Sequence, residues 1–171
     1  MNGPLPVPER KGLTGLCAAL VLVSAFLLFQ VQPVMSKMIL PWFGGSPAVW
    51  TTCMLFFQIF LLLGYLYAHL VVRFLSTRQQ GVMQLSLLLL ALLVLPIEPD
   101  VTWKPADSER PQWRILTLLV ANVGLPYLLL ATSAPLVQSW YSRAFAGRSP
   151  YRFYALSNFG SLAALLSYPF W

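Results

Sequence analysis

The sequence contains few charged residues, one histidine and two cysteines. Only 9% of its 171 residues are charged, whereas an average soluble domain carries about 25%. A single histidine, His69, excludes a bis-histidine haem or a His-rich metal centre built from this chain alone. Cys17 and Cys53 lack the paired spacing of a metal or redox motif, so we expect both to pack as small apolar groups. We therefore predict no metal site, no cofactor and no disulfide.

Hydrophobic residues make up 58% of the chain and indicate an integral membrane protein. The first apolar run, from Leu13 to Val31, is longer than the apolar core of a cleaved signal peptide, about 7–15 residues. Counting about 20 apolar residues for each crossing, we predict an all-α, polytopic helical bundle in one membrane domain, residues 1–171. Its five spans are residues 12–32, 49–75, 81–97, 114–141 and 151–171, with outer loops at 33–48 and 98–113.

The basic residues predict the orientation of these spans, because cytoplasmic loops carry an excess of Lys and Arg. One side holds Arg10, Lys11, Arg73, Arg78, Arg143, Arg148 and Arg152. The other side offsets its bases with the acids of the 98–113 loop, so we expect the amino terminus in the cytoplasm. We therefore attribute the net charge of +6 to basic residues that set the orientation of the spans and contact lipid headgroups. We predict no nucleic-acid partner.

The segment 33–48 places a lysine, two prolines and adjacent glycines between two spans. Ser46 suits an N-cap with Pro47 at the first helical position, and Gly44 and Gly45 permit positive φ. A capped turn is favoured over an anion held at the helix start. Lys37 either reaches the outer headgroups or stays in a re-entrant loop as a gate. The sequence leaves open whether 33–48 is a loop, an interfacial helix or a re-entrant segment.

Polar residues inside spans tend to face the bundle interior. At about 100° per residue, four residues of the second span share one stripe. The simple interpretation is that such groups bond neighbouring helices together. The alternative is a polar cavity near Gln32, Lys37 and Gln58 with aromatic walls, although no span holds an acid to neutralise an amine. The candidate site for a ligand or partner comprises Gln32, Lys37, Gly44, Gly45, Ser46, Trp50, Gln58, Tyr65, His69, Asn122, Ser133 and Asn158.

Several stretches carry a family resemblance: residues 29–33 (FQVQP), 40–53 (LPWFGGSPAVWTTC), 64–69 (GYLYAH), 131–136 (ATSAPL) and 157–161 (SNFGS). The chain resembles the amino-terminal membrane region of bacterial spermidine-synthase-like membrane proteins. These are described as fusions of a major-facilitator-like helical part with an aminopropyltransferase domain. The resemblance implies a location in the bacterial inner membrane. It also implies that further helices and a catalytic domain follow, so we expect this chain to be part of a longer protein.

The catalytic features of that family do not occur in this sequence. It has no glycine fingerprint after a strand and no pair of aspartates placed to deprotonate an amine, so the chain alone should not be an enzyme. We expect a membrane domain that anchors, or feeds a small amine-type substrate to, an aminopropyltransferase-like domain. The alternative is a non-catalytic accessory subunit packed against a larger membrane complex, and a self-contained transporter ranks last. The expected partners are the lipid bilayer and either a membrane protein or a fused carboxy-terminal domain.

Overall fold

The computed structural model describes residues 11–93, 95, 97, 99–104, 111–145 and 151–170. Its elements are α1 (Lys11–Phe43), α2 (Pro47–Phe74), α3 (Thr77–Leu92), η1 (Val101–Trp103), α4 (Pro111–Leu119), η2 (Val120–Gly124), α5 (Leu125–Ala144), α6 (Tyr151–Ser167) and η3 (Tyr168–Phe170). Because α4, η2 and α5 run on as one helix, Pro111–Ala144, the described chain is a bundle of five helices. The prediction of an all-α bundle is confirmed.

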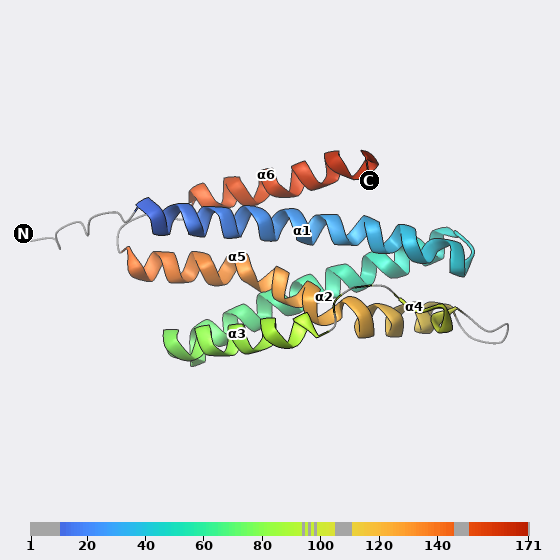
Figure 1. The fold of residues 1–171 in the computed structure, drawn as a ribbon, viewed down its shortest axis with the longest axis horizontal. Helices are drawn as coiled ribbons and strands as arrows, with labels where there is room; N and C mark the ends of the chain where they lie inside the picture. The colour runs from blue at the N-terminus through green and yellow to red at the C-terminus, as the bar shows by residue number, and fades with distance from the viewer. Residues whose placement is uncertain are drawn as a thin grey trace, which may run out of the picture.

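Successive helices run in alternating directions along the long axis of the bundle (Figure 1). Helix α1 packs against α6 on one side and α5 on the other, while α2 packs against α4 and α5. Lys11, Arg73 and Arg143 therefore lie at one end of the bundle, and the amino-terminal end of α4 lies at the other. This alternation of helix directions is the one that the distribution of basic residues predicts.

Three helices are long and apolar enough to cross a membrane: Lys11–Phe43, Pro47–Phe74 and Pro111–Ala144. The first contains 33 residues, about 50 Å at 1.5 Å per residue, so it exceeds a hydrocarbon core of about 30 Å. Helix α6 is shorter, with 17 residues in Tyr151–Ser167. These lengths and compositions make the chain a membrane protein.

The predicted outer loop at 33–48 is mostly helix, which corrects the loop assignment. Helix α1 continues through Pro33 and Pro41 to Phe43, so only Gly44, Gly45 and Ser46 separate it from α2. A proline removes one backbone N–H and frees one carbonyl. Membrane helices tolerate this loss because neighbouring helices and hydroxyl side chains satisfy the freed groups. Prolines 33 and 41 therefore do not end this helix.

The three-residue turn after α1 ends the helix in a Schellman motif. Gly44 and Gly45 have φ of +87° and +59°, and the Gly45 N–H donates a 3.0 Å bond to the carbonyl of Leu40. This six-to-one bond is the signature of the motif, with a left-handed residue after the last helical turn. Ser46 is the N-cap of α2 with Pro47 in the first turn, as predicted, but its side chain makes no capping bond.

Helix α3 is shorter and begins earlier than the predicted span 81–97. It covers Thr77–Leu92, 16 residues, about 24 Å long, and is not among the three helices long enough to cross a membrane. Ser76 and Gln79 form a reciprocal capping box at its start, which fixes the helix four residues before Gly81. The helix ends at Leu92, and the described residues 93, 95 and 97 of the predicted span are not helical.

The long helix Pro111–Ala144 contains a π-helical segment directly before its first internal proline. Pro126 lacks an N–H and its ring would crowd the carbonyl four residues earlier, and the preceding residues 120–124 form the π-helix η2. A π-bulge adds one residue to a turn and so relieves such a clash. The helix Pro111–Ala144 therefore passes Pro126 without a break.

Two glycines allow helices to approach closely. A Cβ at Gly160 of α6 would lie 2.6 Å from the backbone oxygen of Leu22 in α1, and one at Gly64 of α2 would lie 2.6 Å from the Cβ of Ala131 in α5. Small residues at such crossings are how membrane helices gain packing contact. The largest core of the described residues lies between α1, α2, α4 and α5, around Ile39, Phe56, Phe57, Ile115, Leu118 and Tyr127.

Candidate functional site

One predicted site residue takes part in a hydrogen bond between helices. Gln32 of α1 donates from Nε2 to the hydroxyl of Tyr127 of α5, at 2.6 Å. Tyr127 is fully buried, and its ring packs against Phe57 of α2 with centroids 5.0 Å apart. The contacts of Tyr127 with Gln32 and Phe57 therefore join three helices. This contact matches the simple interpretation that polar groups bond helices together.

Two further polar contacts join α3 to α5, and the sequence analysis did not identify them. The buried Gln80 accepts a 2.7 Å bond at Oε1 from Trp140 Nε1, and the buried Gln84 donates a 3.2 Å bond from Nε2 to Thr132 Oγ1. The two glutamines lie four residues apart, so they share one face of α3. The predicted third span began at Gly81 and so left Gln80 outside the helix. The spacing of Gln80 and Gln84 on one helical face was therefore missed.

The predicted stripe on α2 does lie on one face, but that face is exposed. Trp50 and Tyr65 have exposed fractions of 43% and 51%, and Gln58 and His69 are exposed as well. The buried side of α2 instead carries apolar and small residues such as Phe57, packed against α4 and α5. We call Trp50, Gln58, Tyr65 and His69 the α2 polar face.

The remaining amide and hydroxyl residues do not meet this face. Asn122 donates to the carbonyl of Leu118, and Ser133 donates to the carbonyl of Leu129, both within their own helix. Asn158 is exposed on α6, which packs against α1 on the side away from α5 (Figure 1). The structure therefore distributes the predicted candidates over several surfaces and does not gather them in one cavity.

Lys37 lies on a different surface of the molecule from Gln32. Its Nζ lies 5.9 Å from the centroid of the Tyr168 ring of η3, and Lys37 lines a groove with a volume of about 730 Å³ along α1. Gln32 and Lys37 lie five residues apart, a step that turns the helix by about 140°. Gly44, Gly45 and Ser46 are exposed in the turn beyond this groove and do not line it.

Two further cations at this end of the bundle lie over aromatic rings. Lys104 Nζ is 5.8 Å from the ring of Trp42, and the Arg114 guanidinium is 5.4 Å from the ring of Trp103. Arg114 also donates a 2.9 Å bond to the carbonyl of Thr102. Tryptophan and tyrosine beside basic residues are typical of the membrane–water interface, so this end has the composition of an interfacial belt.

Asp100 is the only acidic residue in the part of the chain that the structure describes. The backbone N–H of Thr102 donates a 2.8 Å bond to Asp100 Oδ1, and this bond holds the pKa of the exposed carboxyl below its usual range. Within the described residues no group of three or more His, Cys, Asp and Glu side chains could hold a metal ion. The polar chemistry of the described bundle therefore rests on amides, hydroxyls and basic groups.

Comparison of the chain with protein-family models, with curated proteins and with solved structures finds no match.

Proposed function

We propose that this chain is a multi-pass helical membrane module whose α2 polar face packs against transmembrane helices outside the described bundle. The observation that carries the proposal is the position of Gln58. It lies two to three residues from the midpoint of Pro47–Phe74, about 4 Å along the helix axis. Its side chain is exposed on a helix that is long and apolar enough to cross a membrane.

An exposed amide at this depth would face hydrocarbon. Polar groups inside membranes are expensive and almost always face protein or a water-filled cavity. Tyr65 and His69 continue the same face toward one end of α2, and Trp50 continues it toward the other. A neighbouring helix with hydrogen-bonding side chains would satisfy the whole row, whereas lipid tails would satisfy none of it. The α2 polar face is therefore a packing surface in this proposal.

The family resemblance supplies one context for that packing. In this context the chain is the membrane domain of a spermidine-synthase-like protein of the bacterial inner membrane, with its amino terminus in the cytoplasm. The helices that cover α2 then belong to the same protein, and the module anchors an aminopropyltransferase-like domain. Anchoring is favoured over the feeding of an amine, because the described residues that line the groove along α1 include Lys37 and no acidic side chain, and a lysine would repel a cationic substrate.

The second candidate is a non-catalytic accessory subunit, in which α2 packs against a separate membrane protein. The α2 polar face supports both candidates equally, because it requires neighbouring helices but does not identify the chain to which they belong. The intact mass of the protein purified from its native membrane separates the two candidates. A mass near 19.2 kDa with a stoichiometric partner supports the accessory subunit, and a much larger mass supports the fused membrane domain.

A substitution on the α2 polar face tests the part that both candidates share. Gln58→Leu removes the central amide while keeping an apolar surface, so we expect reduced association with the neighbouring helices. Ser86→Leu is the matched control, because Ser86 is also exposed and polar but lies on α3. Equal association of both variants with the unchanged neighbouring helices would contradict the proposal.

A further inference from the structure

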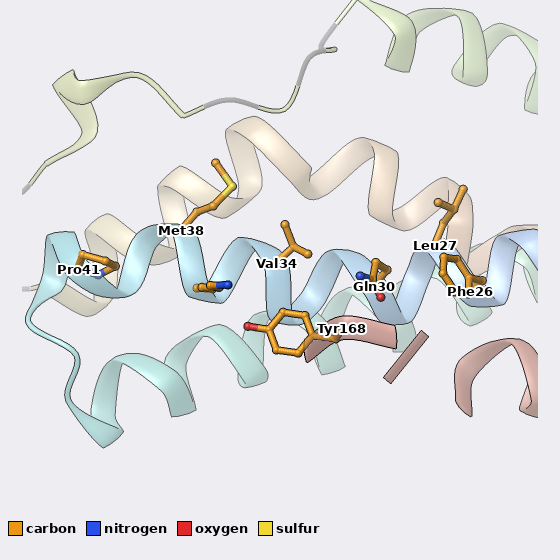
Figure 2. A pocket seen from close by; sticks show the side chains of 8 residues that line it. Phe26, Leu27, Gln30, Val34, Met38, Pro41 and Tyr168 are labelled. Carbon is orange, nitrogen blue, oxygen red and sulfur yellow. The ribbon is translucent and has the colours of Figure 1, made fainter. Parts of the chain in front are cut away.

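A groove runs along the outer side of α1 where η3 approaches it (Figure 2). Its volume is about 730 Å³, within the range of small-molecule sites. Phe26 and Pro41, at its two ends, lie fifteen positions apart, which corresponds to about 22 Å along a helix. The side chains between them include Leu27, Val34 and Met38. The groove is therefore long and largely apolar, a shape that suits a hydrocarbon chain.

Among the described residues that line the groove, Lys37 is the only charged one, and none is acidic. The Lys37 ammonium lies 5.9 Å from the centroid of the Tyr168 ring, a contact that helps to hold the ammonium at the groove. Lys37 lies ten residues from Leu27, about 15 Å along α1. In a hydrocarbon layer about 30 Å thick and centred on Leu27, this charge would lie at the level of the headgroups. The groove thus combines an apolar channel inside the layer with a positive charge at its edge.

Gln30 adds a polar group between the charge and the apolar end. It lies seven residues from Lys37, about 10 Å deeper along α1. Its Oε1 is buried and has no hydrogen-bond partner among the described residues, although buried amides are normally bonded. Rotation of the amide by 180° exchanges its donor and its acceptor. Gln30 can therefore donate from its amide nitrogen to an ester carbonyl, the group that a phospholipid carries between its phosphate and its acyl chains.

From these three features we propose that the groove between α1 and η3 binds one anionic phospholipid. Its phosphate lies at Lys37, its glycerol ester region lies at Gln30, and one acyl chain follows Val34 and Leu27. The inference requires α1 to cross the membrane, as in the proposed function, but it does not depend on what covers the α2 polar face. The bilayer is the source of the ligand, and inorganic phosphate shares only the chemistry of the headgroup.

Native mass spectrometry of the full chain in detergent tests this site by counting bound lipids during titration with phosphatidylglycerol or phosphatidylcholine. We expect one phosphatidylglycerol to bind about fivefold more tightly than phosphatidylcholine, the factor that one basic side chain contributes near anionic lipid. Lys37→Gln should abolish this preference. Lys104→Gln should retain it, because Lys104 lies over Trp42 and does not line the groove.

Two additional arms test the apolar channel and the source of the ligand. Val34→Trp should weaken the binding of both lipids by filling the channel, with the helical circular dichroism unchanged. Millimolar inorganic phosphate should not displace phosphatidylglycerol. The proposal is overturned by equal binding of the two lipids, by an unchanged preference in Lys37→Gln, by an equal loss in Lys104→Gln, or by displacement with phosphate. None of these readouts involves Gln58, so failure here is distinguishable from failure of the proposed function.

Discussion

Gln32 and Tyr127 are 95 residues apart in the sequence and are joined by a 2.6 Å hydrogen bond between α1 and α5. Tyr127 is fully buried, and its ring also contacts Phe57 of α2. Through this bond the half-buried Gln32, a residue of the predicted candidate site, reaches a side chain of the core. It fixes the relative positions of three helices.

The Gln32–Tyr127 bond should contribute measurably to stability. Tyr127→Phe leaves the Gln32 amide without its acceptor, and we expect it to lower the free energy of unfolding by about 0.6 to 1.7 kcal/mol, the range for hydrogen bonds between membrane helices. Tyr154→Phe is the control, because Tyr154 is 53% exposed. A double-mutant cycle with Gln32→Leu, measured by denaturant titration in detergent, should show coupling. Purely additive losses would mean that the bond contributes nothing.

Gly160 should be required for the contact of α6 with α1. An added Cβ would lie 2.6 Å from the backbone oxygen of Leu22, so Gly160→Ala must move α6 outward, at a cost of about 1–3 kcal/mol. Gly81→Ala on α3 meets nothing within 4 Å and should be neutral or stabilising, because alanine favours a helix over glycine. Cysteine cross-linking between α1 and α6 would report the separation. Unchanged cross-linking in Gly160→Ala would contradict this packing.

The turn between α1 and α2 should depend on backbone conformation and not on space. Gly45 has φ of +59° and open space around its Cβ position. Gly45→Val should therefore destabilise the protein by about 1–2 kcal/mol through left-handed strain. Gly45→Asn should cost less, since asparagine adopts this conformation more readily. Thermal unfolding of the two variants makes the comparison, and equal melting temperatures would show that positive φ is not needed here.

The two serine N-caps should differ in their contribution to stability. The Ser76 hydroxyl accepts from the Gln79 backbone in a capping box, whereas Ser46 makes no side-chain capping bond. Ser76→Ala should cost about 1 kcal/mol, and Ser46→Ala should cost only a few tenths of this. Equilibrium unfolding of the two single variants tests the difference. A larger loss in Ser46→Ala would reverse the assignment of the caps.

The sequence predicts those features that depend on composition and local conformation. Apolar runs and alternating basic residues indicate the helices and their alternating directions, and the paired glycines indicate the turn, because only glycine adopts positive φ without cost. The prediction that the first span ends before Pro33 was wrong. The cost of a proline in a membrane helix depends on neighbouring helices that the sequence does not show. The bond between Gln32 and Tyr127 was not predictable for a similar reason, because no local pattern places residues 95 positions apart in contact.

Helical periodicity placed Gln58, Tyr65 and His69 on one face of the second helix, and the structure agrees. Periodicity does not say whether that face points into the bundle. Gly64 and Phe57 determine which side of α2 faces the bundle, because both pack closely against α5. The α2 polar face therefore points outward. The candidate site was therefore predictable as a stripe on one helix and not as a cavity.

Site-specific photo-crosslinking in the native membrane tests the central claim most directly. A photoreactive side chain at Gln58 samples what covers the α2 polar face, and one at Leu88, which is 44% exposed on α3, samples a matched apolar position. The proposed function predicts protein adducts from position 58, mapped to one transmembrane helix, and mainly lipid adducts from position 88. Lipid adducts from both positions would show that the α2 polar face lies against the bilayer and would contradict the account.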